Sequence, residues 1–491
     1  MNTTGDGESK HKPSDFIRFV VADLQGNTWE ITPGNFTTCE ILAGKDKDAP
    51  VYSQLRQFVG NELTRRSDVG AIPKHVVYMK DHELLDYCEV SERGHFSWLP
   101  KGVLLQRLIL DYAANLAHEW GAIEMKNPIL IRGDHNLIGQ LMGEFHERDY
   151  RVDGGRGTCY LRYASDPLAF PFMQKIRFYQ RQSPLKVFEE VSCFRNEQEG
   201  EVSGLKRVRG FTMTDMHAAC ASQEEAYREF EDLCLRFAEL MNDITAKGRW
   251  VLGWEGTIDF YDSNKDWLVS LGKRMEVPAF FKLTPEMSHY YAIKNEYQFI
   301  NQDNSNVQVS TVQWDVKDGP RFGIGYVDVE GKKCPCPVIL HASSFGSTER
   351  ALCAILENIA IDEQSGAPPT FPFWLSPTQI RIIPVADRYL PTSLELCDKI
   401  SQQCLRVDID DREATVGKKI RNGETEWIPF LLVVGEKEKK SSRLCVRSRD
   451  HEGQQHMTLE EFTEMARQKQ RDKPFRPLTL SRRLTRRPSF H

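Results

Sequence analysis

The sequence predicts an α+β protein with a large antiparallel sheet, followed by a smaller α/β domain. Between residues 76 and 365, β-rich segments and amphipathic helices mix without regular alternation of strand and helix. After residue 377, short strand-like and helix-like segments do alternate, which favours a mainly parallel sheet. The Pro-rich stretch GAPPTFPFWLSP, residues 366–377, separates the two patterns and is predicted to be a linker.

The composition is that of an ordinary globular chain. Its 491 residues allow about two to four domains. No apolar run approaches the roughly 20 residues that span a bilayer, and the first residues lack the apolar core of a secretory signal. Twelve cysteines are scattered without a CxxC pair, which is typical of free thiols in a reducing compartment. We therefore expect a cytoplasmic protein with no membrane segment, and the net charge of −6 gives no global basic field.

The N-terminal third contains a predicted hairpin and a predicted long helix. Residues 1–15 are polar and are predicted to be disordered. FIRFVVAD and TWEIT are β-rich runs around the turn LQGN, and this hairpin would open a small domain over residues 16–75. A helix is predicted over residues 103–118, stopping at Gly121. Its apolar positions at helical spacing are Leu105, Leu108, Tyr112 and Leu116.

The C-terminal domain is predicted over residues 378–475. QIRIIPV, LRVDI and PFLLVV are strand-like, while TSLELCDKISQQC and TVGKKIRN are helix-like. Residues 476–491 form a basic tail, and from Arg467 onward the chain has nine Lys or Arg and a single Asp. We expect a solvated, disordered end; a tail that contacts the RNA backbone is the alternative.

The stretch FRNEQEGEVSGLKRVRGF concentrates unusual charge. VFEEVSCFRNE and RVRGFTMTDMH are strand-like, with a turn-rich loop between them. On a strand Arg195 and Glu197 would share one face, and so would Arg207 and Arg209. A guanidinium can hold a phosphate or carboxylate bidentately, a Glu can accept from an exocyclic amine, and a Phe can stack on a base. Together these residue types suit a site that binds an adenine nucleotide next to a carboxylic acid. A charged surface hairpin without a ligand is the alternative.

Two further stretches narrow the interpretation. HASSFGSTERAL places Arg350 on the first turn of an apolar helix, where it needs an anionic or aromatic partner. GAIEMKNPIL places Pro128 between a long helix and a strand. Taken in chain order, GAIEMKNPIL, FRNEQEGEVSGLKRVRGF and HASSFGSTERAL resemble motifs 1, 2 and 3 of class II aminoacyl-tRNA synthetases. SGLKRVRGFTMTDMH and ILHASSFGSTER are most similar to the threonyl-tRNA synthetases, over residues 76–470.

The resemblance implies a fold and a reaction. The fold is a class II antiparallel-sheet catalytic core with a C-terminal α/β anticodon-binding domain. The reaction activates threonine with ATP and Mg²⁺, then transfers it to the 3′ end of tRNA(Thr), in a homodimer built through motif 1. FIRFVVADLQGNTWEIT resembles the segment before the core in archaeal enzymes. Because only some 75 residues precede the core, the family's editing domain is expected to be missing, with serine mischarging corrected by a separate editing protein.

The resemblance also implies roles for individual residues. Arg195 would hold the ATP α-phosphate and the threonine carboxylate, and Arg350 would cover the other face of the nucleotide. The implied ATP-binding residues are Arg195, Glu197, Arg207, Phe211, Gln313 and Arg350. The implied threonine-binding residues are Asp215, Tyr291, Lys294 and His341. The implied anticodon-binding residues are Arg421, Glu438 and Arg447, and Glu413 stands where the family has an Asn.

A zinc site is implied as well. His217 and His341 match zinc-binding positions of the family, and Asp166 in LRYASDPLAF aligns with its third ligand, a Cys. Aspartate is an accepted zinc ligand, although it is harder than thiolate. Three protein ligands would leave room for the amine and hydroxyl of threonine, which excludes valine. Cys334 and Cys336 in KKCPCP are the alternative metal pair.

The sequence allows three other interpretations of the function. A prolyl or seryl enzyme of the same class is disfavoured by His217 and His341. A non-enzymatic relative would be expected to lose a motif arginine, and Arg195 and Arg350 are present. An unrelated nucleotide-binding protein would not explain the C-terminal domain.

Overall fold

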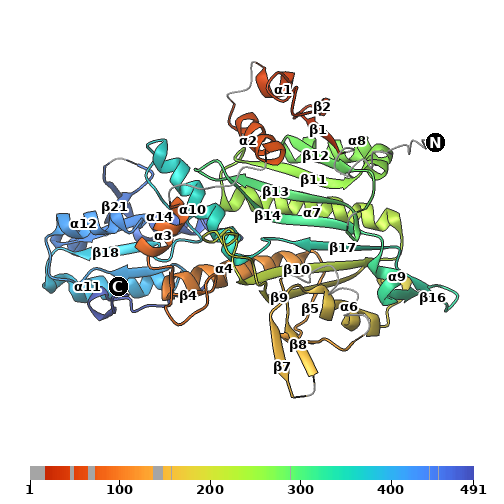
Figure 1. Cartoon of the computed structure of the whole chain (residues 1–491). Coiled ribbons are helices and arrows are strands. Elements are labelled where there is room, and N and C mark those ends of the chain that lie inside the picture. Colours follow the sequence, from red (N-terminus) through yellow and green to blue (C-terminus); the bar gives the residue numbers. More distant parts are fainter. Residues whose placement is uncertain are drawn as a thin grey trace, which may run out of the picture.

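A computed structural model describes residues 17–44, 49–64, 72–135, 148–155, 157–287, 289–441, 443–451 and 453–490. The segment predicted to be disordered, residues 1–15, lies outside the described residues. Figure 1 shows a large sheet through the middle of the molecule, with the C-terminal domain in blue beside it. Within the described residues, no helix is long and apolar enough to cross a membrane.

The centre of the fold is a ten-stranded sheet in the order β2-β1-β12-β11-β13-β14-β17-β10-β9-β5. Neighbouring strands are antiparallel except for the pairs β11–β12 and β5–β9. The α+β class with an antiparallel sheet is thus confirmed. The strands are β1 Arg18–Ala22, β2 Thr28–Ile31, β5 Ile123–Glu124, β9 Leu185–Phe194, β10 Gly210–Cys220, β11 Trp250–Thr257, β12 Ala279–Thr284, β13 Tyr291–Ile300, β14 Asn306–Asp315 and β17 Val338–Ser343.

One face of this sheet is covered by long helices. Along β11, Trp250, Leu252 and Trp254 alternate toward the main core, whereas Val251 packs in a separate cluster on the opposite face. The predicted helix over 103–118 is present as α4 and ends just before Gly121, whose φ is +90°. The covering helices are α4 Pro100–Glu119, α7 Gln223–Ile244, α8 Ile258–Met275 and α10 Thr348–Gln364.

The N-terminal hairpin extends this sheet. β1 pairs with β2, as the sequence predicts, and β1 also pairs with β12. Helix α2, Pro50–Thr64, then lies across the face opposite the long helices, where Phe58 packs against Val251 and Phe280. The approach is so close that a Cβ on Gly253 would be 3.0 Å from the Phe58 ring. This segment, which also includes α1 Glu40–Ala43, therefore adjoins the open face of the sheet.

Smaller elements surround the sheet. β3 pairs with β4 and β15 pairs with β16 in two small two-stranded sheets, and a three-stranded sheet has the order β6-β8-β7. These elements are α3 Lys74–Asp81, β3 Leu85–Tyr87, β4 Phe96–Trp98, β6 Leu130–Arg132, β7 Arg151–Gly154, β8 Gly157–Leu161, α6 Asp166–Lys175, α9 Asp318–Phe322, β15 Gly325–Val327 and β16 Lys333–Pro335.

The C-terminal domain has a five-stranded sheet in the order β19-β18-β20-β21-β22. The predicted strand and helix alternation is present, and β18 is parallel to both β19 and β20. β21 and β22 add antiparallel pairs at one edge, so two of the four strand pairs are antiparallel and the prediction of a mainly parallel sheet is wrong for that edge. The elements are β18 Ile380–Pro384, α11 Leu390–Ser401, β19 Val407–Ile409, α12 Val416–Thr425, β20 Phe430–Val434, α13 Glu436–Lys440, β21 Arg443–Ser448, β22 Gln455–Thr458 and α14 Leu459–Gln468.

The stretch predicted as a linker, residues 366–377, is neither helix nor strand, but it is firmly packed. Phe371 and Trp374 are buried. The Trp374 ring lies 5.3 Å from that of Tyr112 on α4, and the Phe371 ring lies 5.4 Å from that of Trp427 in the C-terminal domain. The connection thus fixes the two domains against each other.

The prediction of a solvated, disordered basic tail is wrong for its described part. Arg476 donates two hydrogen bonds to Asp111 on α4, at 2.5 and 2.6 Å. Farther along, Arg483 donates to Asp411 at 2.6 Å, and the carbonyl of Arg482 accepts from the N–H of Ile409, so the tail lies along the edge strand β19. The basic residues are ordered because acids of both domains face them, and composition alone could not show those partners.

We expect the Arg476–Asp111 contact to hold the tail against α4. The pair is partly exposed, so its contribution should be about 0.5–1 kcal/mol. Arg476→Glu should raise the rate of native-state cleavage after Phe475 by chymotrypsin about fivefold, because local opening becomes more frequent. The charge swap with Asp111→Arg should restore protection. Arg471→Glu, at a residue 81% exposed, is the matched control. Equal cleavage rates in Arg476→Glu and Arg471→Glu would contradict a role for the Arg476–Asp111 contact in holding the tail.

Candidate active site

A cavity of about 250 Å³ opens on the face of the large sheet that the long helices leave free. Phe211 comes from β10, Gln313 from β14 and Arg350 from α10, while the loop between β9 and β10 supplies the others. All six residues predicted for ATP line this single cavity: Arg195, Glu197, Arg207, Phe211, Gln313 and Arg350.

The local structure around the motif 2 residues differs from the prediction. β9 ends at Phe194 and β10 begins at Gly210, so the charged residues belong to the connecting loop. Arg207 lines the cavity, but Arg209 is not among the lining residues and donates to Glu92 and to the carbonyl of Glu197. The prediction that the two arginines share a strand face is therefore wrong. The ladder ends because the backbone N–H of Arg209 donates to the carbonyl of Gly94, while the carbonyl of Arg195 accepts from the N–H of Glu197.

The cavity is strongly positive. The guanidinium of Arg195 lies 5.2 Å from the centre of the Phe211 ring, and Nε of Arg350 donates to the carbonyl of Lys206 at 3.2 Å. Burial lowers the pKa of Arg350, and the charges of Arg195 and Arg207 lower it further. Glu197 is only 4% exposed and accepts from Arg207 at 2.7 Å. Clustered cations of this kind are stabilised by a bound anion such as a polyphosphate.

Sheet register joins this cavity to the rest of the site. His217 on β10 pairs with His341 on β17, His341 pairs with Gln313 on β14, and Gln313 pairs with Lys294 on β13. Directly opposed residues on one face have neighbouring side chains. The row therefore runs from the histidines, past the cavity, to Lys294.

Asp166, His217 and His341 form a group that could hold a metal ion. Oδ1 of Asp166 lies 3.1 Å from Nε2 of His217 and 3.6 Å from Nδ1 of His341. Ligands about 2.0–2.2 Å from a tetrahedral zinc ion are roughly 3.3–3.5 Å apart, so the spacing fits. Burial alone would raise the pKa of Asp166, but hydrogen bonds to both histidines lower it well below the usual value, so the carboxylate is ionised.

The surroundings support the same assignment. Nε2 of His341 lies 2.9 Å from Asp315, which also accepts from the backbone N–H groups of residues 317 and 318. This contact orients the imidazole of His341 and directs its Nδ1 at Asp166. Asp315, Asp318 and His341 form a second possible ligand group around the same histidine. Cys334 and Cys336, the alternative pair, belong to neither group found among the described residues.

The residues predicted for threonine border this group. Nζ of Lys294 lies 2.9 Å from Glu296, 3.0 Å from Glu255 and 5.1 Å from the centre of the Tyr291 ring. Burial would lower the pKa of Lys294, but the charge of Glu296 and then those of Tyr291 and Glu255 raise it, so the ammonium form persists. Asp215 is buried, with a carboxylate oxygen 3.9 Å from Nε2 of His217, and burial raises its pKa.

Several residues of the site were not predicted from the sequence. Glu255 and Glu296 hold Lys294, Asp315 orients His341, and Tyr290 stacks on His341 with 4.6 Å between ring centres. Glu296 could have been found, since it is two residues from Lys294 on a strand and so shares its face. The partners of the histidines come from other strands and have no local signal.

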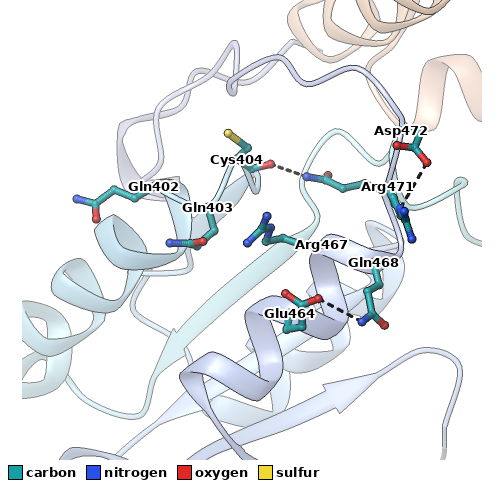
Figure 2. Close-up of a pocket in the computed structure, with 9 residues that line it drawn as sticks. Gln402, Gln403, Cys404, Glu464, Arg467, Gln468, Arg471 and Asp472 are labelled. Carbon is teal, nitrogen blue, oxygen red and sulfur yellow. Dashed lines mark hydrogen bonds and ion pairs between the residues drawn. The ribbon is translucent and has the colours of Figure 1, made fainter.

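The predicted anticodon residues lie on separate elements of the C-terminal domain. Arg421 is exposed on α12, and Glu438 on α13 accepts from the backbone N–H of Gly435 at 3.0 Å. Arg447 on β21 lines a cavity of about 310 Å³ together with Arg449. Figure 2 shows a different, polar hollow of about 600 Å³ between the end of α11 and α14, lined by Gln403, Arg467 and their neighbours. None of the predicted anticodon residues lines it.

An antiparallel sheet bearing this arginine-lined cavity defines a class II aminoacyl-tRNA synthetase. Residues 162–359 match the tRNA synthetase class II core domain (G, H, P, S and T), and residues 379–469 match an anticodon binding domain. The chain belongs to the threonine–tRNA ligase family, the family that the motifs indicated.

That assignment is carried by sequence relatives. The threonine–tRNA ligase of Methanobrevibacter smithii is 38% identical, across 89% of this chain and 71% of that protein. The enzyme of Thermococcus gammatolerans is 36% identical, across 99% of this chain and 77% of that protein. A crystal structure described as the RNA binding domain of threonyl-tRNA synthetase from Cryptosporidium parvum Iowa II shares the fold, with a TM-score of 0.69, 22% identity, and coverage of 80% of this chain and 98% of that one.

Glu349 should make the stability of the free protein depend on pH. It is 2% exposed at the start of α10, and burial raises its pKa from 4.5 to about 7. The folded state therefore keeps a proton that the unfolded chain releases, so stability should fall as pH rises from about 4.5 to about 7. Glu349→Gln should remove this slope and be more stable by about 1–3 kcal/mol at pH 8, but not at pH 4.5. The free energy of unfolding of both proteins would be measured with urea across this pH range. The same pH dependence in both would contradict the raised pKa of Glu349.

Proposed function

We propose that the cavity and the neighbouring Asp–His group form one synthetic site that converts threonine and ATP to threonyl-adenylate and then to threonyl-tRNA. The observation that supports this proposal is the cross-strand row from His217 through His341 and Gln313 to Lys294, because it places the arginine-lined cavity next to the residues that would bind threonine. The catalytic groups are Arg195 and Arg350.

In the first step, a carboxylate oxygen of threonine attacks the α-phosphorus of ATP and the bond to pyrophosphate breaks. Arg195 would hold both the α-phosphate and the carboxylate, which neutralises the repulsion between the two reactants. Arg207 would hold the terminal phosphates. Arg350 would cover the nucleotide opposite Phe211, with Glu197 accepting from the adenine amine. The 3′-terminal ribose hydroxyl of tRNA then attacks the carbonyl carbon and adenylate leaves.

The amino-acid pocket would take the polar groups of threonine. We propose that Asp166, His217 and His341 hold Zn²⁺, which when bound supplies a Lewis acid for the amine and hydroxyl of the substrate. Mg²⁺ enters with ATP and offsets phosphate charge. Asp215, Tyr291 and Lys294 would contact the remaining polar atoms. A pocket that reads amine and hydroxyl rejects valine, which has no hydroxyl.

Serine is the harder competitor, because it keeps both groups and lacks only the methyl. One methyl group allows discrimination of about 1–3 kcal/mol. We therefore propose that the synthetic site activates serine measurably. This follows from the pocket alone, whatever corrects the product afterwards.

The partner surfaces are also proposals. Arg421, Glu438 and Arg447 would hydrogen-bond the splayed anticodon bases of tRNA(Thr). Ile123, Ile129 and Leu130 are 51%, 47% and 49% exposed around the edge strand β5, and such an apolar edge would pair with a second copy in a homodimer. The twelve cysteines are all free, which agrees with the cytoplasm.

Amino-acid-dependent ATP–pyrophosphate exchange should test the reaction. We expect fast exchange with threonine, exchange about 10- to 200-fold less efficient with serine, and none above background with valine. Thorough removal of metal, followed by assay with Mg²⁺ alone, should abolish exchange, and Zn²⁺ should restore it. Exchange that survives metal removal would reject the zinc, and no exchange with threonine would reject the proposed reaction.

Ligand variants should identify which group holds the ion. Asp166→Asn should lower the bound zinc per chain, measured after dialysis against a weak chelator, by at least about tenfold. Asp166→Cys should retain it. Asp318→Asn is the matched control from the second group and should leave zinc content unchanged. Loss of zinc in Asp318→Asn but not in Asp166→Asn would place the ion in the other group.

A further inference from the structure

We propose that helix α2 of the N-terminal segment positions Lys294, through a chain of side-chain amides that crosses the open face of the sheet. Helix α2 contacts β11 and β13 (Figure 1), and it packs on the face of the sheet opposite the long helices, which is also the face of the site. The inference rests on the proposed function, because it takes Lys294 as part of the threonine pocket.

The chain is continuous from α2 to β13. Nδ2 of Asn61, on α2, donates to Oδ1 of Asn306 at 3.2 Å. Nδ2 of Asn306 donates to Oε1 of Gln298 at 2.9 Å, and Nε2 of Gln298 donates to Oε2 of Glu296 at 2.8 Å. The other oxygen of Glu296 faces Nζ of Lys294 at 2.9 Å. Three hydrogen bonds and one ion pair thus join a helix outside the catalytic core to the predicted substrate lysine.

The strand geometry explains how the chain can exist. Lys294, Glu296 and Gln298 alternate along β13, so their side chains lie on one face. The intervening Tyr297 points into the core beneath the helices. Gln298 is only 4% exposed, and a buried amide of this kind needs its partners.

The direction of the hydrogen bonds is also fixed. An ionised carboxylate can only accept, so Glu296 requires the NH₂ group of Gln298. The oxygen of Gln298 then requires a donor from Asn306, and the oxygen of Asn306 requires a donor from Asn61. Burial would raise the pKa of Glu296, but Lys294 and Gln298 hold it below the usual value, so the carboxylate end of the chain stays charged.

This arrangement decides where the lysine points. An ammonium group has three donors, and Glu255 and Glu296 take two of them. The third is then directed by the positions of the two carboxylates. If Glu296 loses its anchor at Oε2, it can rotate and draw Lys294 with it. Asn61, Asn306 and Gln298 are therefore positioning residues for the amino-acid pocket, with no direct contact with the reacting atoms.

The test uses isosteric changes in the full chain. In Asn306→Asp the new carboxylate cannot donate to Gln298, so Gln298 must turn and present its oxygen to Glu296. Asn61→Asp breaks the chain one step earlier, at a more exposed position. Asn304→Asp is the matched control, because it adds the same charge two residues from Asn306 at an exposed side chain. Asn304 meets the chain only through its backbone carbonyl, which accepts from Nδ2 of Asn61 at 2.8 Å and is kept in the variant.

Pyrophosphate exchange should report KM for threonine and for ATP separately. Loss of one hydrogen bond to a charged group corresponds to roughly a tenfold weaker interaction, so both chain variants should raise KM for threonine about five- to tenfold. KM for ATP, kcat and the melting temperature should change little, and the control should resemble the unmodified protein.

Three results would overturn the inference: an unchanged KM for threonine in both variants, an equal rise in the control, or a parallel rise in KM for ATP, which would indicate a general structural defect. Failure of the proposed function is distinguishable, because the unmodified protein would then show no exchange with threonine at all.

Discussion

The register of four neighbouring strands is the constraint on which the site depends. His217, His341, Gln313 and Lys294 face one side of the sheet because their strands pair at those residues. A slip of one residue in any strand would turn its side chain into the core. The opposite face resists such a slip, since the preceding or following residues Met216, Leu340, Trp314 and Ile293 are buried beneath the helices. Core packing and active-site geometry are therefore set by the same pairing.

The same logic explains why the charged groups gather where they do. On the free face of the sheet, helix α2 covers the part near β11, β12 and β13, so polar side chains can meet elsewhere on that face without displacing the core. Arg195, Arg207 and Arg350 converge on that face from a loop and a helix end, and their mutual repulsion is relieved when an anion binds. Along the row through Gln313, carboxylates face the basic groups: Glu255 and Glu296 hold Lys294 at one end, and Asp166 meets the histidines at the other. The sheet thus presents an anion site next to a cation site, which is what a nucleoside triphosphate and an amino acid together require.

Much of this could be predicted from the sequence, where the signal is local. The helix at residues 100–119, the hairpin at 18–31 and the alternation after residue 377 follow from periodicity and turn residues. Arg195, Glu197 and Arg350 could be singled out because they stand in motifs. The ends of β9 and β10 could not, because the N–H of Arg209 that would have continued the ladder donates to Gly94, which lies more than 100 residues away in the chain. Nor could the order of the tail, whose partners Asp111 and Asp411 lie far away in the chain.

Segments near both ends of the described chain meet the core at places that matter for function. Helix α2 lies on the open face of the sheet, and its amides reach the row that begins with the histidines. The tail, with Arg476 on Asp111 of α4 and Arg483 on Asp411, spans the catalytic and C-terminal domains. Trp374 adds a second contact to α4 from the connection between the domains. A domain held at several points keeps a nearly fixed distance from the active site. Since a tRNA must present its 3′ end to the site while its anticodon is bound elsewhere, a fixed separation lets binding energy at the anticodon position the reacting hydroxyl.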